Sequence, residues 1–423
     1  MQVDDASERL QDFLQWCDRV GLVLSKKVCL STEGTVVDYG MLAKEDIEEG
    51  EVLFTIPRSA LLHQETTKVS ALLKKEKSSL ESTSGWVPLL LALLYESTSP
   101  ESHWRPYLSL WPGFKALDHP MFWSKEERDK LLKGTGVPEA VATDLSNIQR
   151  EYADIVLPFI MRHPELWNPN THTLELYTQL VAFVMAYSPF HFYMLNHVST
   201  HNANLEFNPD SLKMVSVRRL RKGEEVFNTY GQMANWQLLH MYGFTEPYPE
   251  NSNDTADIPV ACLYQAAAQD VQSEPERQLF DERFKVLSQM MEENAAFVFS
   301  DQGCLTDSEL HSALKLLSMS QEEFSEFRDN EGWEDDDEDD DDKISQAFSN
   351  EGLPDLKSSW KRLIHEAARL TLRSYGDAEL ESDRKLMEDG ADLKGRSSRR
   401  WRALQVRFGQ KVILHRLLEL TAS

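Results

Sequence analysis

The feature that most constrains the fold is a long helical stretch with strand-like segments at both ends. Residues 34–43 and 51–57 contain short β-branched and aromatic runs, and residues 46–50 between them form a predicted turn that ends on glycine. Comparable runs return at 205–218. From about 61 to 187 the apolar spacing instead favours helices. The sequence therefore predicts an α+β fold, in which a small β unit is closed by segments distant in sequence.

A further predicted strand, residues 225–231 with the sequence EVFNTYG, ends on Tyr230. Its β-branched and aromatic residues favour a strand, and the Thr-Tyr-Gly break would hold the tyrosine hydroxyl in a fixed place. An ordinary edge strand explains this heptad equally well. The case for a functional tyrosine therefore depends on other motifs.

The C-terminal part is predicted to be an all-α domain, residues 258–423, after a polar linker at 251–257. Before it, the expected divisions are 1–60 with an amphipathic helix at 8–20, the helical insertion 61–187, and a second β segment, 188–247. Residues 334–342 are nine consecutive acids, which predict a disordered loop over 331–345. This run is either a solvated spacer or a segment that attracts or mimics a basic partner.

The charge balance limits the classes of partner. Seventy acidic against 44 basic residues give a net charge of −26, which argues against nucleic acid or an anionic membrane and favours basic proteins. The four cysteines lie far apart, as expected for free thiols in a reducing compartment. With no secretory signal and no long apolar run, we expect a soluble protein of the nucleus or cytosol.

Three motifs in order carry a family resemblance. Asp38-Tyr-Gly-Met41, Leu195-Asn-His197 and the 225–231 heptad resemble SET-domain protein-lysine methyltransferases of the Rubisco large-subunit methyltransferase type. The resemblance covers nearly the whole chain. It implies a SET fold with a helical insertion, a helical domain that helps to hold substrate, and S-adenosylmethionine as the cofactor that methylates exposed lysines of other proteins.

The resemblance also implies roles for single residues. Tyr230 matches the catalytic tyrosine that orients the lysine amine. The residues that match cofactor contacts are Val37, Asp38, Tyr39, Gly40, Tyr187, Asn196, His197 and Tyr242. Those that match substrate contacts are Trp86, Ser188 and Phe227. A plain hairpin glycine and a core tryptophan are the alternative interpretations of Gly40 and Trp86. His197 and His201 have helical metal-ligand spacing, but no further ligands accompany them, so no metal site is expected.

These residue types suit methyl transfer. The lysine nitrogen, methyl carbon and sulfur must be aligned, and the amine must be neutral although free lysine has a pKa of about 10.4. A narrow aromatic channel meets both needs, because burial disfavours the ammonium form and π faces stabilise a sulfonium. Crowding by Phe227 and Tyr242 predicts that one methyl group is added.

One segment departs from the family pattern. Family members usually carry Pro-x-x-Asp directly before Leu-Asn-His, whereas here residues 189–194 (PFHFYM) lead straight into Leu195. Two hypotheses follow. The chain is either an active methyltransferase of nuclear proteins such as transcription factors and histone tails, located in the nucleus with the cytoplasm as a second site, or an impaired variant that only binds basic protein segments. The sequence leaves the oligomeric state open.

Overall fold

The chain forms two compact units in the computed structural model, which describes residues 2–36, 39–111, 118–186, 195–269, 271–291, 295–329, 341–376, 379–389 and 398–422. The first unit comprises Met1–Ser124, Glu139–Met233 and Gln237–Phe244. The second comprises Lys125–Pro138, Ala234–Trp236 and Thr245–Ser423. The second unit thus includes a stretch, Lys125–Pro138, that the sequence analysis placed in the helical insertion.

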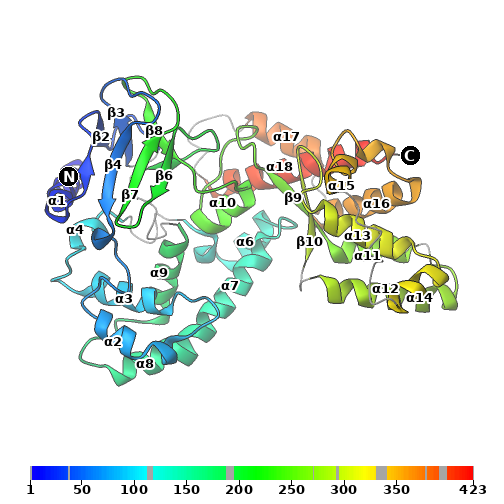
Figure 1. Cartoon of the computed structure of the whole chain (residues 1–423), viewed down its shortest axis with the longest axis horizontal. Coiled ribbons are helices and arrows are strands. Elements are labelled where there is room, and N and C mark those ends of the chain that lie inside the picture. Colours follow the sequence, from blue (N-terminus) through cyan, green and yellow to red (C-terminus); the bar gives the residue numbers. More distant parts are fainter. Residues whose placement is uncertain are drawn as a thin grey trace. The chain divides into compact units, whose positions relative to one another are not determined.

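Two four-stranded sheets form the β part of the first unit (Figure 1). One sheet has the order β1 (Val23–Leu24), β4 (Val52–Pro57), β7 (Ser211–Ser216) and β6 (Ala203–Phe207). The other has the order β2 (Val28–Ser31), β3 (Gly40–Ala43), β8 (Glu225–Asn228) and β5 (Asn196–His197).

Each sheet joins segments from both sides of the helical insertion. β4 pairs antiparallel with β7, so that Phe54 lies opposite Met214, and β3 pairs antiparallel with β8, so that Met41 lies opposite Val226. These four side chains are almost fully buried, and the burial of their apolar surface stabilises the long-range pairing. The predicted closure of a small β unit by distant segments is confirmed.

The insertion is helical, as predicted. Its elements are η1 (Arg58–Ala60), α2 (Ser70–Lys75), η2 (Lys77–Leu80), α3 (Val87–Thr98), α4 (Arg105–Leu108), η3 (Pro120–Phe122), α7 (Val137–Glu151), a π-helical turn (Tyr152–Val156), α8 (Leu157–Arg162) and α9 (Leu174–Ala186). α3 and α9 pack together and are buried on nearly all sides, which explains their continuous apolar sequences. α10 (Asn235–Tyr242) follows β8.

The predicted amphipathic helix near the amino terminus is α1 (Gln2–Val20). It buries Phe13, Trp16 and Cys17 on one face, and the Phe13 and Trp16 rings stack at 5.8 Å. Gly21 follows with a φ of +77°, a left-handed conformation that suits glycine and ends the helix. This prediction is confirmed.

The second unit is mainly helical but contains a two-stranded sheet. Its helices are α6 (Lys125–Leu131), α11 (Val260–Ala268), α12 (Glu274–Met290), α13 (Asp307–Ser318), α14 (Gln321–Asp329), α15 (Asp341–Ala347), η6 (Leu353–Asp355), α16 (Ser358–Ser374), α17 (Leu380–Asp389) and α18 (Arg399–Leu420). β9 (Thr255–Pro259) pairs antiparallel with β10 (Ala296–Ser300). The prediction of a helical domain is confirmed, but the domain is not all-α.

The sheet explains where the prediction of a polar linker at 251–257 was wrong. Residues 255–257 belong to β9, which pairs with β10 and buries Ala256 and Ile258 in the core. In β10, Phe297 and Phe299 are buried in the same way. Each strand has only five residues and lies next to a helix, so the alternation of buried and less buried residues is too short to be recognised in the sequence.

The prediction of a disordered loop over 331–345 is wrong for residues 341–345. Residues 341–345 are helical, since α15 begins at Asp341 and its first turn contains Asp341 and Asp342, where carboxylates favour a helix amino terminus. Residues 330–340 lie outside the described part of the chain.

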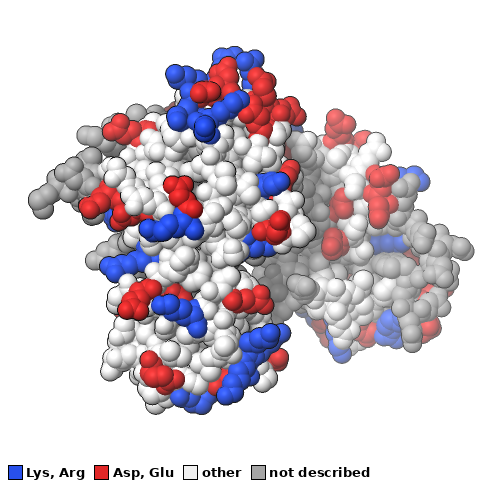
Figure 2. Space-filling view, turned by 60° about the vertical axis from the view of Figure 1, so that its left-hand side comes forward, with Lys and Arg blue, Asp and Glu red and all other residues white. Residues whose placement is uncertain are grey.

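Acidic and basic side chains are intermingled on the face drawn in Figure 2. Several make surface ion pairs, such as Arg219 with Asp46 at 3.0 Å and Lys27 with Glu51 at 2.8 Å. The net negative charge is therefore not gathered in one broad patch on this face. Among the described residues, no helix combines the length and the apolar character that a bilayer span requires.

Candidate active site

Three neighbouring strands bring the sequence motifs together. β8 lies between β3 and β5, and β5 runs parallel to it with Asn196 opposite Phe227 and His197 opposite Asn228. Tyr230 follows the end of β8. Residues separated by more than 150 positions thus meet at one edge of the sheet, as expected where catalytic groups are assembled on rigid strands.

The side chain of Asn196 joins the first motif to the third. Its Nδ2 donates to the backbone oxygen of Tyr39 at 3.1 Å and to Oε1 of Glu225 at 2.6 Å. The other Glu225 oxygen, Oε2, accepts from the Val36 backbone nitrogen at 2.9 Å. Burial raises the pKa of Glu225, while the Asn196 and Val36 hydrogen bonds oppose this shift. A largely buried carboxylate therefore fixes both the Asn196 amide and the chain before Val37.

Gly40 allows this close approach. A Cβ atom on residue 40 would lie 2.5 Å from Cγ2 of Thr35 and 2.6 Å from Oε1 of Glu225, which no real side chain tolerates. Gly40 is the first residue of β3 and lies opposite Ser31, where the β2–β3 hairpin closes, so the hairpin-glycine interpretation agrees with its place but leaves out its contact with Glu225. Its lack of a side chain is required by packing against Glu225.

Tyr230 is held at both ends. Its hydroxyl donates to the backbone oxygen of Leu195 at 2.8 Å, and its backbone nitrogen donates to Nδ1 of His197 at 3.0 Å. The ring stacks on His197 at 5.0 Å and on Tyr242 at 4.7 Å, with Phe244 edge-on at 6.3 Å. These four rings are called the aromatic cluster below.

The aromatic cluster is largely shielded from water. Tyr242 is 8% exposed, and burial raises its pKa to about 12, so its hydroxyl is neutral at physiological pH. A cluster of neutral ring faces favours a cation placed against it. The geometry thus combines a fixed phenol, a buried carboxylate and aromatic walls.

Asn202 supports the site, and the sequence analysis missed it. It is 1% exposed; its Nδ2 donates to the Glu225 backbone oxygen at 2.8 Å, and its Oδ1 accepts from the Phe227 backbone nitrogen at 2.8 Å. The Asn202 backbone nitrogen also donates to the Phe227 oxygen at 3.1 Å. Asn202 therefore hydrogen-bonds the β8 backbone through both its side-chain amide and its own backbone nitrogen. Only its nearness to His197 in sequence could have indicated it.

The remaining predicted site residues have different outcomes. Phe227 lies on β8 beside Asn196, and its exposure is intermediate. Val37, Asp38, Tyr187 and Ser188 lie outside the described residues, as does most of the segment before Leu195 that departs from the family pattern.

The metal alternative for His197 and His201 gains no support. His197 Nδ1 accepts from Tyr230, and the His201 ring lies 3.4 Å from the Ser199 backbone oxygen. In the part of the chain that the structure describes, no group of three or more potential metal ligands is found.

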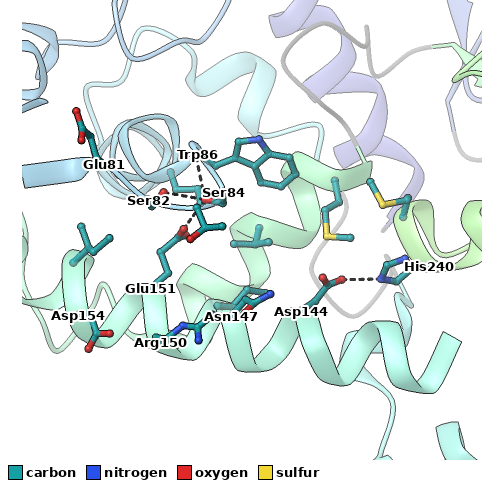
Figure 3. Close-up of a pocket in the computed structure, with 17 residues that line it drawn as sticks. Glu81, Ser82, Ser84, Trp86, Asp144, Asn147, Arg150, Glu151, Asp154 and His240 are labelled. Carbon is teal, nitrogen blue, oxygen red and sulfur yellow. Dashed lines mark hydrogen bonds and ion pairs between the residues drawn. The ribbon is translucent and has the colours of Figure 1, made fainter. Parts of the chain in front are cut away.

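Trp86 lies in a hollow beside the aromatic cluster rather than in it. The hollow, called the α7 groove below, has a volume of ≈ 810 Å³ and lies between the start of α3, one face of α7, the end of α9 and α10 (Figure 3). Met241 of α10 lines it and directly precedes Tyr242. The core-tryptophan interpretation is therefore incomplete, because Trp86 is half-buried and faces this space.

Comparison with protein families places two known domains on the chain. The SET domain model matches residues 38–231, and the Rubisco LSMT substrate-binding model matches residues 274–414. The first match begins just before Tyr39 and ends just after Tyr230; it includes Asn196 and His197, whereas Tyr242 and Phe244 of the aromatic cluster follow it.

Curated proteins match over nearly their whole length. N-lysine methyltransferase setd6 of Salmo salar is 62% identical and covers 99% of this chain and 97% of its own. N-lysine methyltransferase SETD6 of Homo sapiens is 47% identical over 97% of this chain and 95% of its own. The alignment with the Salmo salar protein spans 440 positions, more than the 423 residues of this chain, so that protein has residues with no counterpart here.

Solved structures share the fold. The SET domain of LSMT bound to lysine and AdoHcy matches with a TM-score of 0.67 and 20% identity, covering 98% of this chain and 91% of that one. Rubisco LSMT bound to AdoMet matches with a TM-score of 0.66, also at 20% identity and over the same shares. The α+β fold predicted from the sequence is confirmed.

Proposed function

The chain belongs to the setd6 family of SET-domain N-lysine methyltransferases, and from this premise we propose that it adds single methyl groups to lysines of nuclear proteins. Its activity is protein-lysine methylation with S-adenosylmethionine as the methyl donor. Transcription factors and histone tails are the proposed substrates, since a net charge of −26 favours basic partners. The proposed location is the nucleus, with the cytoplasm as a second site.

The observation that carries the proposal is the convergence of Asn196, His197 and Tyr230. S-adenosylmethionine, when bound, supplies an electrophilic methyl group on a positively charged sulfur. Tyr39, Gly40, Asn196 and His197 are the described residues proposed to hold it. The site fits such a group, because the aromatic cluster offers ring faces to a cation.

Tyr230 is proposed to orient the lysine amine. Its hydroxyl oxygen donates to Leu195 and keeps lone pairs that can accept a hydrogen bond from an amine. Burial against the aromatic cluster lowers the cost of the neutral amine relative to the ammonium form. The rings thereby exclude water, and the phenol fixes the direction of approach, which for an in-line displacement supplies much of the acceleration.

Transfer of one methyl group is supported by crowding. Tyr242 lies only 4.7 Å from Tyr230, and Phe244 closes a further side of the cluster. A methylated amine needs additional volume to turn its lone pair towards a second donor. Mass spectrometry of the product checks this, and a mainly trimethylated lysine would contradict it.

A second candidate function rests on the relatives' additional residues. If the missing residues belong to the segment before Leu195, the chain is a binding module for basic segments that no longer holds the cofactor. Titration calorimetry with S-adenosylmethionine separates the two. Micromolar binding that disappears in Asn196→Ala supports the enzyme, and a well-folded chain that binds no cofactor supports the module.

A further inference from the structure

The α7 groove has the dimensions of a short extended peptide. Its floor is one helical face, with Asp144 at one end, Glu151 in the middle and Asp154 at the other end (Figure 3). At 1.5 Å per residue, the ten steps from residue 144 to residue 154 span about 15 Å, the length of four to five extended residues. Trp86, Met185 and Met241 supply apolar wall. The groove is therefore longer than a single lysine side chain needs.

A π-helical turn shapes the far end of this floor. It covers Tyr152–Val156, directly after α7, and brings Asp154 and Ile155 into the lining of the groove. π-helical turns are rare and occur frequently at functional sites. Its retention here is consistent with a binding role for this end.

The carboxylates along the groove differ in how they are bonded. Asp144 Oδ2 lies 2.7 Å from Nε2 of His240. Glu151 accepts from the hydroxyls of Ser84 and Tyr177, each at 2.5 Å. Glu81 and Asp154 are exposed, and neither side chain has a hydrogen bond or ion pair with any described residue. The cation beside them, Arg150, donates to Asn147 Oδ1 at 2.6 Å. Glu81, on the side of α3, and Asp154, on the floor, thus remain available as acceptors on opposite sides of the groove (Figure 3).

We propose that the α7 groove holds the substrate segment that flanks the modified lysine, and that Glu81 and Asp154, on opposite sides of the groove, bind lysine or arginine side chains of that segment. The near end adjoins the methyl-transfer site, because Met241 precedes Tyr242, which stacks on Tyr230. Four carboxylates against one guanidinium give the groove a negative potential that selects a cationic side chain. This inference rests on the proposed function and adds a sequence preference to it.

The test measures binding of peptides to the full chain in the presence of S-adenosylmethionine. Each peptide carries a central norleucine, which cannot accept a methyl group, and one arginine moved along an otherwise neutral sequence. We expect an arginine about four to five residues from the centre, on one side, to tighten binding roughly two- to fivefold. The gain should shrink at high salt, because the carboxylates are exposed.

Three variants decide the assignment. The double change Glu81→Gln with Asp154→Asn should abolish the gain from the distal arginine, whereas Glu101→Gln, an exposed acid outside the groove, should leave it intact. Asp154→Lys should instead favour a peptide with glutamate at that position. If the double variant and Glu101→Gln bind all peptides alike, or if a free arginine amide binds as tightly as the peptide, the inference is wrong.

The two proposals fail differently. A chain that binds the norleucine peptides as expected but transfers no methyl group to their lysine counterparts would contradict the proposed function. The proposal that the groove binds basic peptides would still stand. A chain that methylates lysine peptides with no preference for distal arginine would support the proposed function and contradict the proposed role of the groove.

Discussion

The methyl-transfer site and the α7 groove are built in opposite ways. The site takes Tyr39 and Gly40, Asn196, Tyr230 and Tyr242 from four segments, and backbone or buried hydrogen bonds join them. The groove floor is one face of one helix, and its terminal carboxylates are exposed. A converging site holds each residue through its neighbours, whereas a helix face presents residues one by one.

This difference predicts how each region tolerates change. In the site, a single substitution should disturb several contacts, because Glu225 serves Asn196 and Val36 together. In the groove, a substitution should remove one local interaction of modest strength. The site is therefore suited to alignment, and the groove to a graded preference among substrates.

The largest effect is expected for Tyr230→Phe. The change removes the hydroxyl that donates to Leu195 and that is proposed to orient the amine. We expect the turnover number to fall at least about a hundredfold, the loss that misplacement by 1 Å can cause. Single-turnover methylation measures it, with cofactor affinity as the control. A variant as fast as the parent would show that the Tyr230 hydroxyl is not catalytic. The site would then be no more sensitive to this substitution than the groove is expected to be.

Asn202→Ala should reveal how far the site depends on support between segments. It leaves the Glu225 oxygen and the Phe227 nitrogen without their side-chain partner in a buried place, at roughly 1–3 kcal/mol for each unsatisfied group. We expect the free energy of unfolding to fall by about 2 to 4 kcal/mol. Urea denaturation measures this, and Asn204→Ala, which changes a partly exposed amide two residues further on in β6, should change stability far less.

Gly40→Ala should weaken cofactor binding by about tenfold or more, equivalent to about 1.4 kcal/mol. The added methyl group would displace Thr35 or Glu225 and, through Glu225, the Asn196 amide. Calorimetry measures the loss. Gly50→Ala is the matched control, since its Cβ meets open space and only its φ of +82° is strained. Equal cofactor affinity in both variants would show that the close approach at Gly40 is unimportant.

The smallest effect concerns pH. The folded-state pKa of Glu225 is raised above its ordinary value of 4.5, so between these two values the folded chain binds a proton that the unfolded chain has released. The contribution of Glu225 to the free energy of unfolding should therefore decrease as pH rises through this window. Denaturation at several pH values should show a slope that Glu225→Gln reduces. An unchanged slope would mean that Glu225 is less buried than its contacts indicate.

Part of the site could be predicted because its residues lie in short motifs. Tyr230, Asn196 and Gly40 each belong to a run of three to seven residues whose order matches a family, and the structure brings them together. Glu225 stands in the predicted strand, but a carboxylate in a short strand usually faces solvent. Its inward orientation depends on Asn196, 29 positions away, and no local pattern records that bond.

Other features could not be predicted for similar reasons. The Asn202 side chain bonds backbone groups of β8. Every residue has such groups, so no residue type in the sequence marks them as partners of Asn202. The acidic face of α7 resembles any solvated helix face until the start of α3 is placed opposite it. The strands β9 and β10 are five residues each, too short for a period of two to stand out against flanking helices.

The interleaved strand order has a consequence during synthesis. β3 and β4 leave the ribosome early, but their partners β8 and β7 lie on the other side of the insertion. At 5–20 residues per second, the intervening chain takes on the order of 10 to 30 s to emerge. During that time the edges of β3 and β4 that later pair with β8 and β7 remain unpaired. A chaperone that shields nascent strands should therefore raise the yield of folded first unit more than that of the mainly helical second unit.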